Sequence, residues 1–185
     1  MKKTVSLMIL ALLASLPLIA QELHVDYDPK KGIVSIPFGQ AQAQKAYVLV
    51  KRAVDGDTLL LVDGQRVRLI GIDTPEMHES DKLYRDAQRT NQDVNTIKKL
   101  GRQSYEFTRS MVEGKRVSLE FDVERRDKYE RLLAYVYLED GTFVNAEIVK
   151  QGYASLMTIP PNNKYADLFL KLYQEARENK RGLWK

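Results

Sequence analysis

One stretch, residues 54–76, constrains the fold of this 185-residue chain more than any other part of the sequence. It contains two apolar runs, Thr58–Val62 and Val67–Ile72, on either side of Asp63-Gly64. Asp-Gly is typical of a tight turn because both central residues of such a turn must tolerate a positive φ. The stretch therefore predicts a β-hairpin, and the tightest version has a two-residue turn.

A two-residue turn would set Asp57 opposite Ile70 and Val54 opposite Asp73. Acidic side chains would then gather at the end of the hairpin far from the turn, and the members of this group are Asp55, Asp57, Asp73 and Glu76. Arg68 would lie between them, on the strand face that carries Ile70 and Ile72 rather than Val67 and Leu69. A cation among clustered carboxylates suggests an anionic ligand beside a metal ion.

Each part of this pattern also has a purely structural interpretation. Asp-Gly is the commonest kind of turn signal, and Asp55 is either an acid close to a ligand or a simple turn residue. Residues 73–76, Asp-Thr-Pro-Glu, are equally typical of a strand that ends at a helix cap, with Asp73 or Thr74 as the cap and Pro75 in the first turn.

Three motifs in order resemble the thermonuclease (staphylococcal nuclease) family. They read D-G-D-T at 55–58, R-L-I-G-I-D-T-P-E at 68–76 and D-K-Y-E-R-L-L-A-Y-V-Y at 127–137. The resemblance extends from about Tyr47 to Trp184. It implies an α+β, mainly β fold: an OB-fold five-stranded barrel with three helices, whose concave face commonly binds oligonucleotides.

The resemblance also implies a metal site. Asp57, Asp73 and the main-chain carbonyl of Thr74 would be ligands of one divalent ion, Ca2+. Calcium accepts carboxylate, carbonyl and water oxygens at flexible geometry, whereas Mg2+ demands a stricter octahedron and is the less favoured alternative.

Catalytic and substrate-binding roles come from the same resemblance. Arg68 and Arg131 would clamp phosphate oxygens, and Glu76 would either orient the attacking water or remove its proton. Lys128 and Tyr129 would lie near the terminal phosphate of a bound nucleotide. The implied protein is an exported calcium-dependent nuclease that hydrolyses DNA and RNA to 3′-phosphorylated products. The alternative is a non-catalytic OB-fold module that binds nucleic acid.

Two departures bear on these roles. Arg131 follows a charged connector and could instead form a surface pair with Glu124 or Asp127, as arginines in charged loops usually do. Met157 and Ile159 stand where the family commonly has tyrosines that contact the nucleotide. Base–aromatic stacking is worth about 1–3 kcal/mol per base, so the substitution lowers the expected substrate affinity without touching the chemical step.

Composition limits the metal chemistry and the source of nucleic-acid affinity. The chain has no cysteine and two histidines, which excludes disulfides and thiolate zinc sites and leaves oxygen ligands. Its formal charge is +4, and loss of Lys2 and Lys3 with a leader would lower it to +2. Attraction to an anionic polymer must therefore come from local clustering of basic residues.

The chain is organised in three segments. Residues 1–20 have the layout of a signal peptide: two lysines, an apolar run and a small residue, Ala20, before the expected cleavage site. Residues 21–45 form an extended lead-in, and residues 46–185 form the nuclease-like domain. We expect a secreted or periplasmic monomer without stable membrane association, and an uncleaved anchor, as in a structural envelope protein, is the alternative.

Apolar periodicity places the other elements. Beyond the hairpin, strands are predicted at 46–52, 117–123 and 131–138. Helices are predicted through 100–112, over 142–152 and over 164–180. Part of Lys82–Asn95 is interpreted as an insertion beside the site that shapes substrate access, and a solvated surface helix or loop is the alternative.

Overall fold

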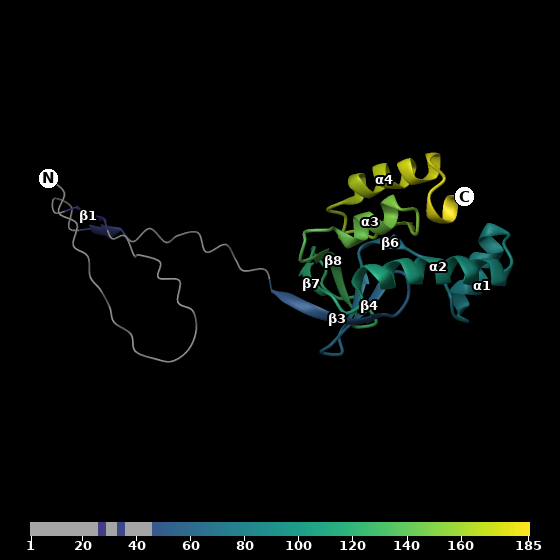
Figure 1. Cartoon of the computed structure of the whole chain (residues 1–185), viewed down its shortest axis with the longest axis horizontal. Helices are drawn as coiled ribbons and strands as arrows, with labels where there is room; N and C mark the ends of the chain where they lie inside the picture. Colours follow the sequence, from purple (N-terminus) through teal and green to yellow (C-terminus); the bar gives the residue numbers. More distant parts are fainter. Residues whose placement is uncertain (1–25, 29–32, 36–45) are drawn as a thin grey trace. The chain divides into compact units, whose positions relative to one another are not determined.

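A computed structural model describes residues 26–28, 33–35 and 46–185 of the protein. The chain divides into two units, Met1–Gln44 and Lys45–Lys185 (Figure 1). The barrel, the helices and the candidate site described below all belong to the second unit.

The described part of the first unit is a pair of short strands. β1 (Asp26–Asp28) pairs antiparallel with β2 (Ile33–Ser35), within the segment for which the sequence predicts only extended chain. The predicted signal peptide, residues 1–20, lies outside the described residues.

Five strands of the second unit close into a barrel. Their order around it is β3 (Tyr47–Ala53), β4 (Thr58–Leu61), β5 (Arg66–Leu69), β8 (Leu132–Leu138) and β7 (Arg116–Glu120). Strand β7 pairs back to β3, and every pair is antiparallel except β5 with β8. A closed five-stranded barrel with this connectivity is consistent with an OB fold, so the predicted fold class is confirmed in its barrel.

The predicted hairpin forms between β4 and β5, but its register differs by one residue. Thr58 lies opposite Arg68, and the Leu69 amide donates to the Asp57 carbonyl at 2.9 Å, so Asp57 faces Leu69 rather than Ile70. The turn has three residues, because the Leu61 amide bonds the carbonyl of Gln65 and Gly64 takes a φ of +87°. A three-residue loop that ends in a left-handed glycine is a common hairpin connection.

The returning chain does not continue as one strand through Ile72. Gly71, with a φ of +84°, turns it into a separate strand, β6 (Gly71–Asp73), which pairs with β9 (Ser155–Met157). A side chain at position 71 would also collide with the Phe169 ring. Val67 and Leu69 face the barrel interior, yet the turn at Gly71 buries Ile72 as well. The prediction that Arg68 shares one strand face with Ile70 and Ile72 is therefore wrong for Ile72, because β5 ends at Leu69 and Ile72 belongs to β6.

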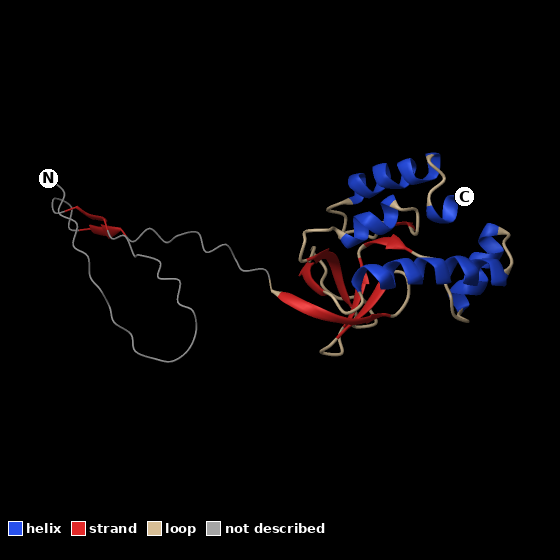
Figure 2. Ribbon diagram, in the orientation of Figure 1, coloured by secondary structure: helices blue, strands red, loops and turns tan. Residues whose placement is uncertain are grey.

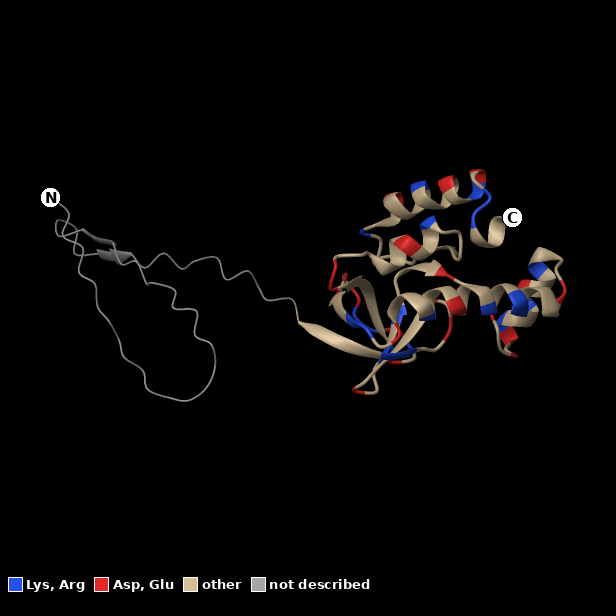
Figure 3. Cartoon of the chain, viewed as in Figure 1, with Lys and Arg blue, Asp and Glu red and all other residues tan. Residues whose placement is uncertain are grey.

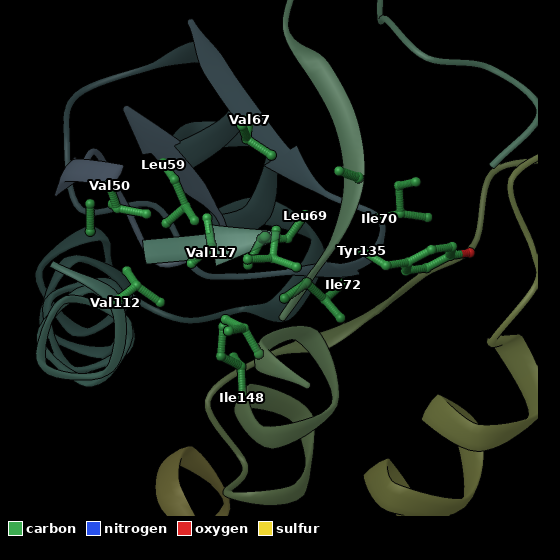
Figure 4. Close-up of a cluster of buried hydrophobic side chains, with 14 of the residues drawn as sticks. Val50, Leu59, Val67, Leu69, Ile70, Ile72, Val112, Val117, Tyr135 and Ile148 are labelled. Carbon is green, nitrogen blue, oxygen red and sulfur yellow. The ribbon is translucent and has the colours of Figure 1, made fainter. Parts of the chain in front are cut away.

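The core fills the barrel and the gap between the barrel and its covering helices (Figure 4). Strand residues such as Val50, Leu59 and Val117 are fully buried, as alternation along each strand requires. Val112 and Ile148 reach this core from two different helices. Because the core continues from barrel to helices, it fixes the helices relative to the strands.

The described part of the chain contains four α-helices, not the three predicted (Figure 2). They are α1 (Asp81–Thr90), α2 (Val94–Val112), α3 (Val144–Lys150) and α4 (Ala166–Glu178), followed by a 3-10 turn at Gly182–Trp184. The extra helix is α1, which forms within the segment interpreted as an insertion. The Ser80 hydroxyl accepts from the Leu83 amide at the start of α1, and left-handed Asn91 ends it.

None of the helices within the described residues is long and apolar enough to cross a membrane.

Candidate active site

All eight residues singled out from the sequence line one cavity of about 500 Å3 at the side of the barrel. They are Asp57, Arg68, Asp73, Thr74, Glu76, Lys128, Tyr129 and Arg131. Asp55, Met157 and Ile159 line the same cavity. A volume of this order is typical of small-ligand sites. The side chains that line this cavity are acidic, basic and, along one edge, apolar.

Asp57 is the most strongly fixed acid of the cavity. Its Oδ2 accepts hydrogen bonds from the Thr74 amide at 2.8 Å and the Thr74 hydroxyl at 3.0 Å. Its Oδ1 accepts from the Thr58 hydroxyl at 3.2 Å and lies 3.1 Å from Nη1 of Arg68. Asp57 therefore joins the β4 end of the hairpin to the segment after β6, and no helix starts at Asp73 or Thr74.

Arg68 bridges the two acids proposed as metal ligands. Its Nη2 lies 3.1 Å from Oδ1 of Asp73, while its Nη1 reaches Asp57 and also donates to the Leu69 carbonyl at 3.1 Å. The Arg68 side chain is only 12% exposed. A planar guanidinium held on two sides in this way presents its remaining edge in a fixed direction.

Lys82 completes the acidic cluster from helix α1. Its Nζ lies 3.1 Å from Oδ1 of Asp73, 3.1 Å from Oε1 of Glu76 and 3.2 Å from the Thr74 carbonyl oxygen. The sequence offers no signal for these contacts, because Lys82 reaches the acids only through the packing of α1. Its role here is the main feature of the site that the sequence did not predict.

Helix α2 contacts the main-chain segments that carry the acids. Gly101 packs against the main chain of the site, where a Cβ atom would lie 2.6 Å from the Pro75 oxygen and the Glu76 carbonyl carbon. The Thr108 hydroxyl donates to the Gly56 carbonyl at 2.7 Å. The same helix thus sets the positions of the loop before Asp57 and of the segment that carries Glu76.

Arg131 lines the cavity from the residue just before β8. Its Nε and Nη2 each approach Oδ2 of Asp127 at 2.7 Å, and its guanidinium lies over the Tyr129 ring at 5.5 Å. The Lys128 ammonium lies 5.0 Å from the centre of the same ring. Arg131 therefore pairs with Asp127, as the surface-pair interpretation expects, and it also lines the cavity, where the phosphate-clamp interpretation requires it to be.

Charge in the site shifts several pKa values. Burial and the neighbouring Asp57 charge raise the pKa of Asp55 to about 7. Burial also raises the pKa of Asp73, although Lys82 opposes the shift. Burial would lower the pKa of Lys82, but Asp73 and Glu76 outweigh it and the net shift is upward. Burial raises the pKa of Asp127, but the hydrogen bonds from Arg131 lower it by more, so the net shift is downward.

The donor set fits a hard divalent cation. No group of three or more acidic, histidine or cysteine side chains in the described ranges is arranged to hold a metal, so a ligand set here would be completed by main-chain oxygen or water. Asp57, Asp73 and the Thr74 carbonyl supply such a set, and carboxylate and carbonyl oxygens suit Ca2+ or Mg2+. The Lys82 ammonium already lies against Asp73 and Thr74, which demonstrates that these oxygens accommodate a cation.

Replacement of Asp57 tests how far this acid supports the fold. The clustering of carboxylates in the sequence suggests that Asp57→Ala could stabilise the metal-free fold, because it would relieve charge repulsion. The structure leads us to expect destabilisation instead, because the buried Thr74 amide would lose its acceptor. We expect the free energy of unfolding to fall by about 1–3 kcal/mol in urea denaturation with chelator present. Asp167→Ala, at an exposed position in the first turn of α4, should change it by less than about 1 kcal/mol. An Asp57→Ala protein as stable as wild type would contradict this.

Charge is not spread as one broad basic face. Along the helices, basic and acidic residues are interspersed (Figure 3). The basic residues that line the cavity are Arg68, Lys82, Arg126, Lys128 and Arg131. Basic residues thus gather at the cavity, together with six acidic ones among the described residues: Asp55, Asp57, Asp73, Glu76, Glu124 and Asp127.

Comparison with known proteins agrees with this geometry. The profile of the family described as Staphylococcal nuclease homologue matches residues 66–185. The chain is 35% identical to a thermonuclease of Staphylococcus intermedius over 100% of the chain and 99% of that protein. It is 32% identical to endonuclease YncB of Bacillus subtilis over 90% of the chain and 75% of that protein. On these grounds, and with the barrel and motif residues in place, the chain belongs to the staphylococcal nuclease family.

Proposed function

We propose that this protein is an exported, calcium-dependent nuclease that hydrolyses DNA and RNA and leaves 3′-phosphorylated ends. Its membership of the hydrolases, as a nuclease, follows from the family and from its similarity to a thermonuclease and an endonuclease. The observation that carries the finer proposal is the convergence of Asp57, Asp73, Glu76, Arg68 and Arg131 on one cavity.

The proposed division of labour follows from the charges around the cavity. Asp57, Asp73 and the Thr74 carbonyl would hold the divalent cation, which when bound supplies neutralisation of phosphate charge. Glu76, on the same wall, would orient the attacking water or accept its proton.

Both arginines would act on the phosphate. A guanidinium donates two parallel hydrogen bonds to phosphate oxygens, and such bonds are strongest toward charge that develops in the transition state. Arg68 is oriented by Asp57 and Asp73, and Arg131 by Asp127. Lys128 and Tyr129 lie beside Arg131, where they would contact the terminal phosphate of a bound nucleotide.

A non-catalytic binding module is the alternative function. Such a module needs the barrel and a basic surface but has no use for clustered acids, which repel a polyanion. The acids lining this cavity, several of them largely buried, therefore favour the enzyme.

Export rests on the leader-like sequence of residues 1–20 and remains a proposal of its own. Cleavage after Ala20 would release a protein without stable membrane association, and we propose that it acts as a monomer. Mass determination of the N-terminus of protein purified from the native host distinguishes a cleaved leader from an uncleaved anchor.

One assay tests the proposed function. The purified protein is incubated with plasmid DNA and with RNA in calcium, and the new ends are treated with a 3′-phosphatase before polymerase extension. We expect cleavage of both polymers and ends that become extendable only after phosphatase treatment. Binding of both polymers without cleavage would instead support the binding module.

The apolar edge of the cavity leads to a prediction about substrate affinity. Ile159 is 63% exposed and lines the cavity, so a tyrosine at this position can stack on a base. We expect Ile159→Tyr to lower KM for single-stranded DNA about fivefold or more, because about 1 kcal/mol of stacking would be gained. Turnover should change little, since stacking stabilises ground state and transition state alike.

The control for this experiment is Val62→Tyr, an exposed position in the β4–β5 turn that does not line the cavity. Steady-state kinetics should find its KM unchanged. If Ile159→Tyr alters turnover alone, the stacking explanation is wrong.

A further inference from the structure

The Lys82 ammonium makes the contacts that a bound cation would make. A lysine ammonium has three N–H donors, and its neighbours here are three oxygens: Oδ1 of Asp73, Oε1 of Glu76 and the Thr74 carbonyl, at 3.1, 3.1 and 3.2 Å. Two of these oxygens belong to the proposed ligand set. Lys82 is thus an internal cation within the metal-binding cluster.

Helix α1 delivers Lys82 to this position without locking it there. Its neighbour Leu83 is fully buried and its amide is capped by the Ser80 hydroxyl, so the first turn of α1 is anchored. The Lys82 side chain is 29% exposed, and its four-carbon stem is flexible. The ammonium can therefore leave the acids by side-chain rotation, with no unfolding of the helix.

A divalent cation and the ammonium compete for these oxygens. Calcium binds carboxylate and carbonyl oxygens at about 2.3–2.6 Å, and a cation at that distance repels an ammonium that contacts the same oxygens. Asp73 Oδ1 accepts from Arg68 as well as Lys82, so its charge is already shared by two cations. A divalent cation therefore enters more readily when the ammonium moves out.

We propose that Lys82 is a built-in competitor for the divalent cation and sets the concentration at which the metal site fills. This inference rests on the metal site of the proposed function. In the metal-free protein the ammonium balances the charges of Asp73 and Glu76, and in the metal-bound protein it is displaced toward the open side of the cavity. The competition lowers the affinity of the site for calcium and keeps the metal-free protein folded.

Titration calorimetry with calcium chloride at constant ionic strength tests the competition. The proteins compared are full-length wild type, Lys82→Met and Lys98→Met. Methionine keeps the length of the stem and removes the charge. Lys98 is the matched control, because it pairs with Glu79 at 2.7 Å, is similarly exposed and does not line the cavity. Both variants lose one positive charge, so the net charge of the protein changes equally, and only Lys82→Met removes a charge that contacts the proposed metal site.

We expect Lys82→Met to bind calcium at least about tenfold more tightly than wild type, and Lys98→Met to stay within about threefold. In chelator, Lys82→Met should melt at a lower temperature than wild type, and calcium should raise its melting temperature by a larger amount. This thermal pattern also establishes that the variant is folded.

The remaining outcomes would contradict the proposal, and each would point to a different cause. Equal calcium affinity in Lys82→Met and Lys98→Met would mean that the metal site exists but that Lys82 does not compete for it. Weaker binding by Lys82→Met would make the lysine a support for the site rather than a competitor. If none of the three proteins binds calcium, the metal site of the proposed function fails together with this inference.

Discussion

Chelation of divalent cations is expected to lower cleavage of DNA and RNA by at least about 10³-fold, and added calcium is expected to restore it. The metal ligands proposed are Asp57, Asp73 and the Thr74 carbonyl, all of which line the cavity. Stabilisation of transition-state charge by a divalent cation is worth several kcal/mol, and about 4 kcal/mol corresponds to a 10³-fold change in rate.

Loss of activity in chelator must be separated from loss of the fold. Lys82 and Arg68 already balance the acids in the metal-free protein, so we expect the far-ultraviolet circular dichroism and a cooperative thermal transition to persist in chelator. Magnesium should restore less activity than calcium, because it demands stricter octahedral geometry. An unchanged rate in excess chelator would rule out the metal site.

Arg131→Lys is expected to lower turnover by about 10²-fold, equivalent to about 2.7 kcal/mol of transition-state stabilisation. Asp127 holds Nε and Nη2 of Arg131 and orients the guanidinium. Lysine keeps the charge but has no planar fork to donate two parallel bonds to a phosphate. The melting temperature should stay nearly unchanged, since partly exposed pairs contribute about 0–1 kcal/mol.

Arg116→Lys provides the control for this substitution. Arg116 pairs with Glu139 at 3.2 Å, both side chains are more than half exposed, and neither lines the cavity. Single-turnover kinetics should find a large defect in Arg131→Lys and none in Arg116→Lys, with calcium bound by both. Near-normal turnover of Arg131→Lys would mean that Arg131 pairs with Asp127 but does not clamp the phosphate. That result would strengthen the case for a binding module.

Local sequence determined most of the barrel. Alternation of apolar residues placed β3, β7 and β8 to within a few residues, because a strand with one buried face imposes a period of two. Asp63-Gly64 determined that β4 and β5 form a hairpin, and Gly152, with a φ of +79°, ends the short helix predicted before it. The barrel itself came from the family resemblance, and the order of strands around it, including the pairing of β5 with β8, came only from the structure.

The exact alignment of the hairpin was decided by turn geometry. Asp-Gly is compatible with a two-residue and a three-residue turn, and the latter shifts the register by one position. Burial of Val67 and Leu69 inside the barrel favours the observed register, because a shift by one residue would exchange the two faces of a strand. The acids still converge, since Gly71 redirects the chain into β6 beside the hairpin.

The chemical groups of the cavity were named from the sequence, but not all of their partners were. The resemblance to the thermonuclease family pointed to Asp57, Asp73 and Arg131, and all three line the cavity. Asp127 was among the partners that the sequence offered for Arg131, whereas Lys82 became part of the site only through the packing of helix α1 beside the acids. Contacts of a flexible lysine depend on where its helix packs, and that packing depends on side chains from several distant segments at once, which no local pattern encodes.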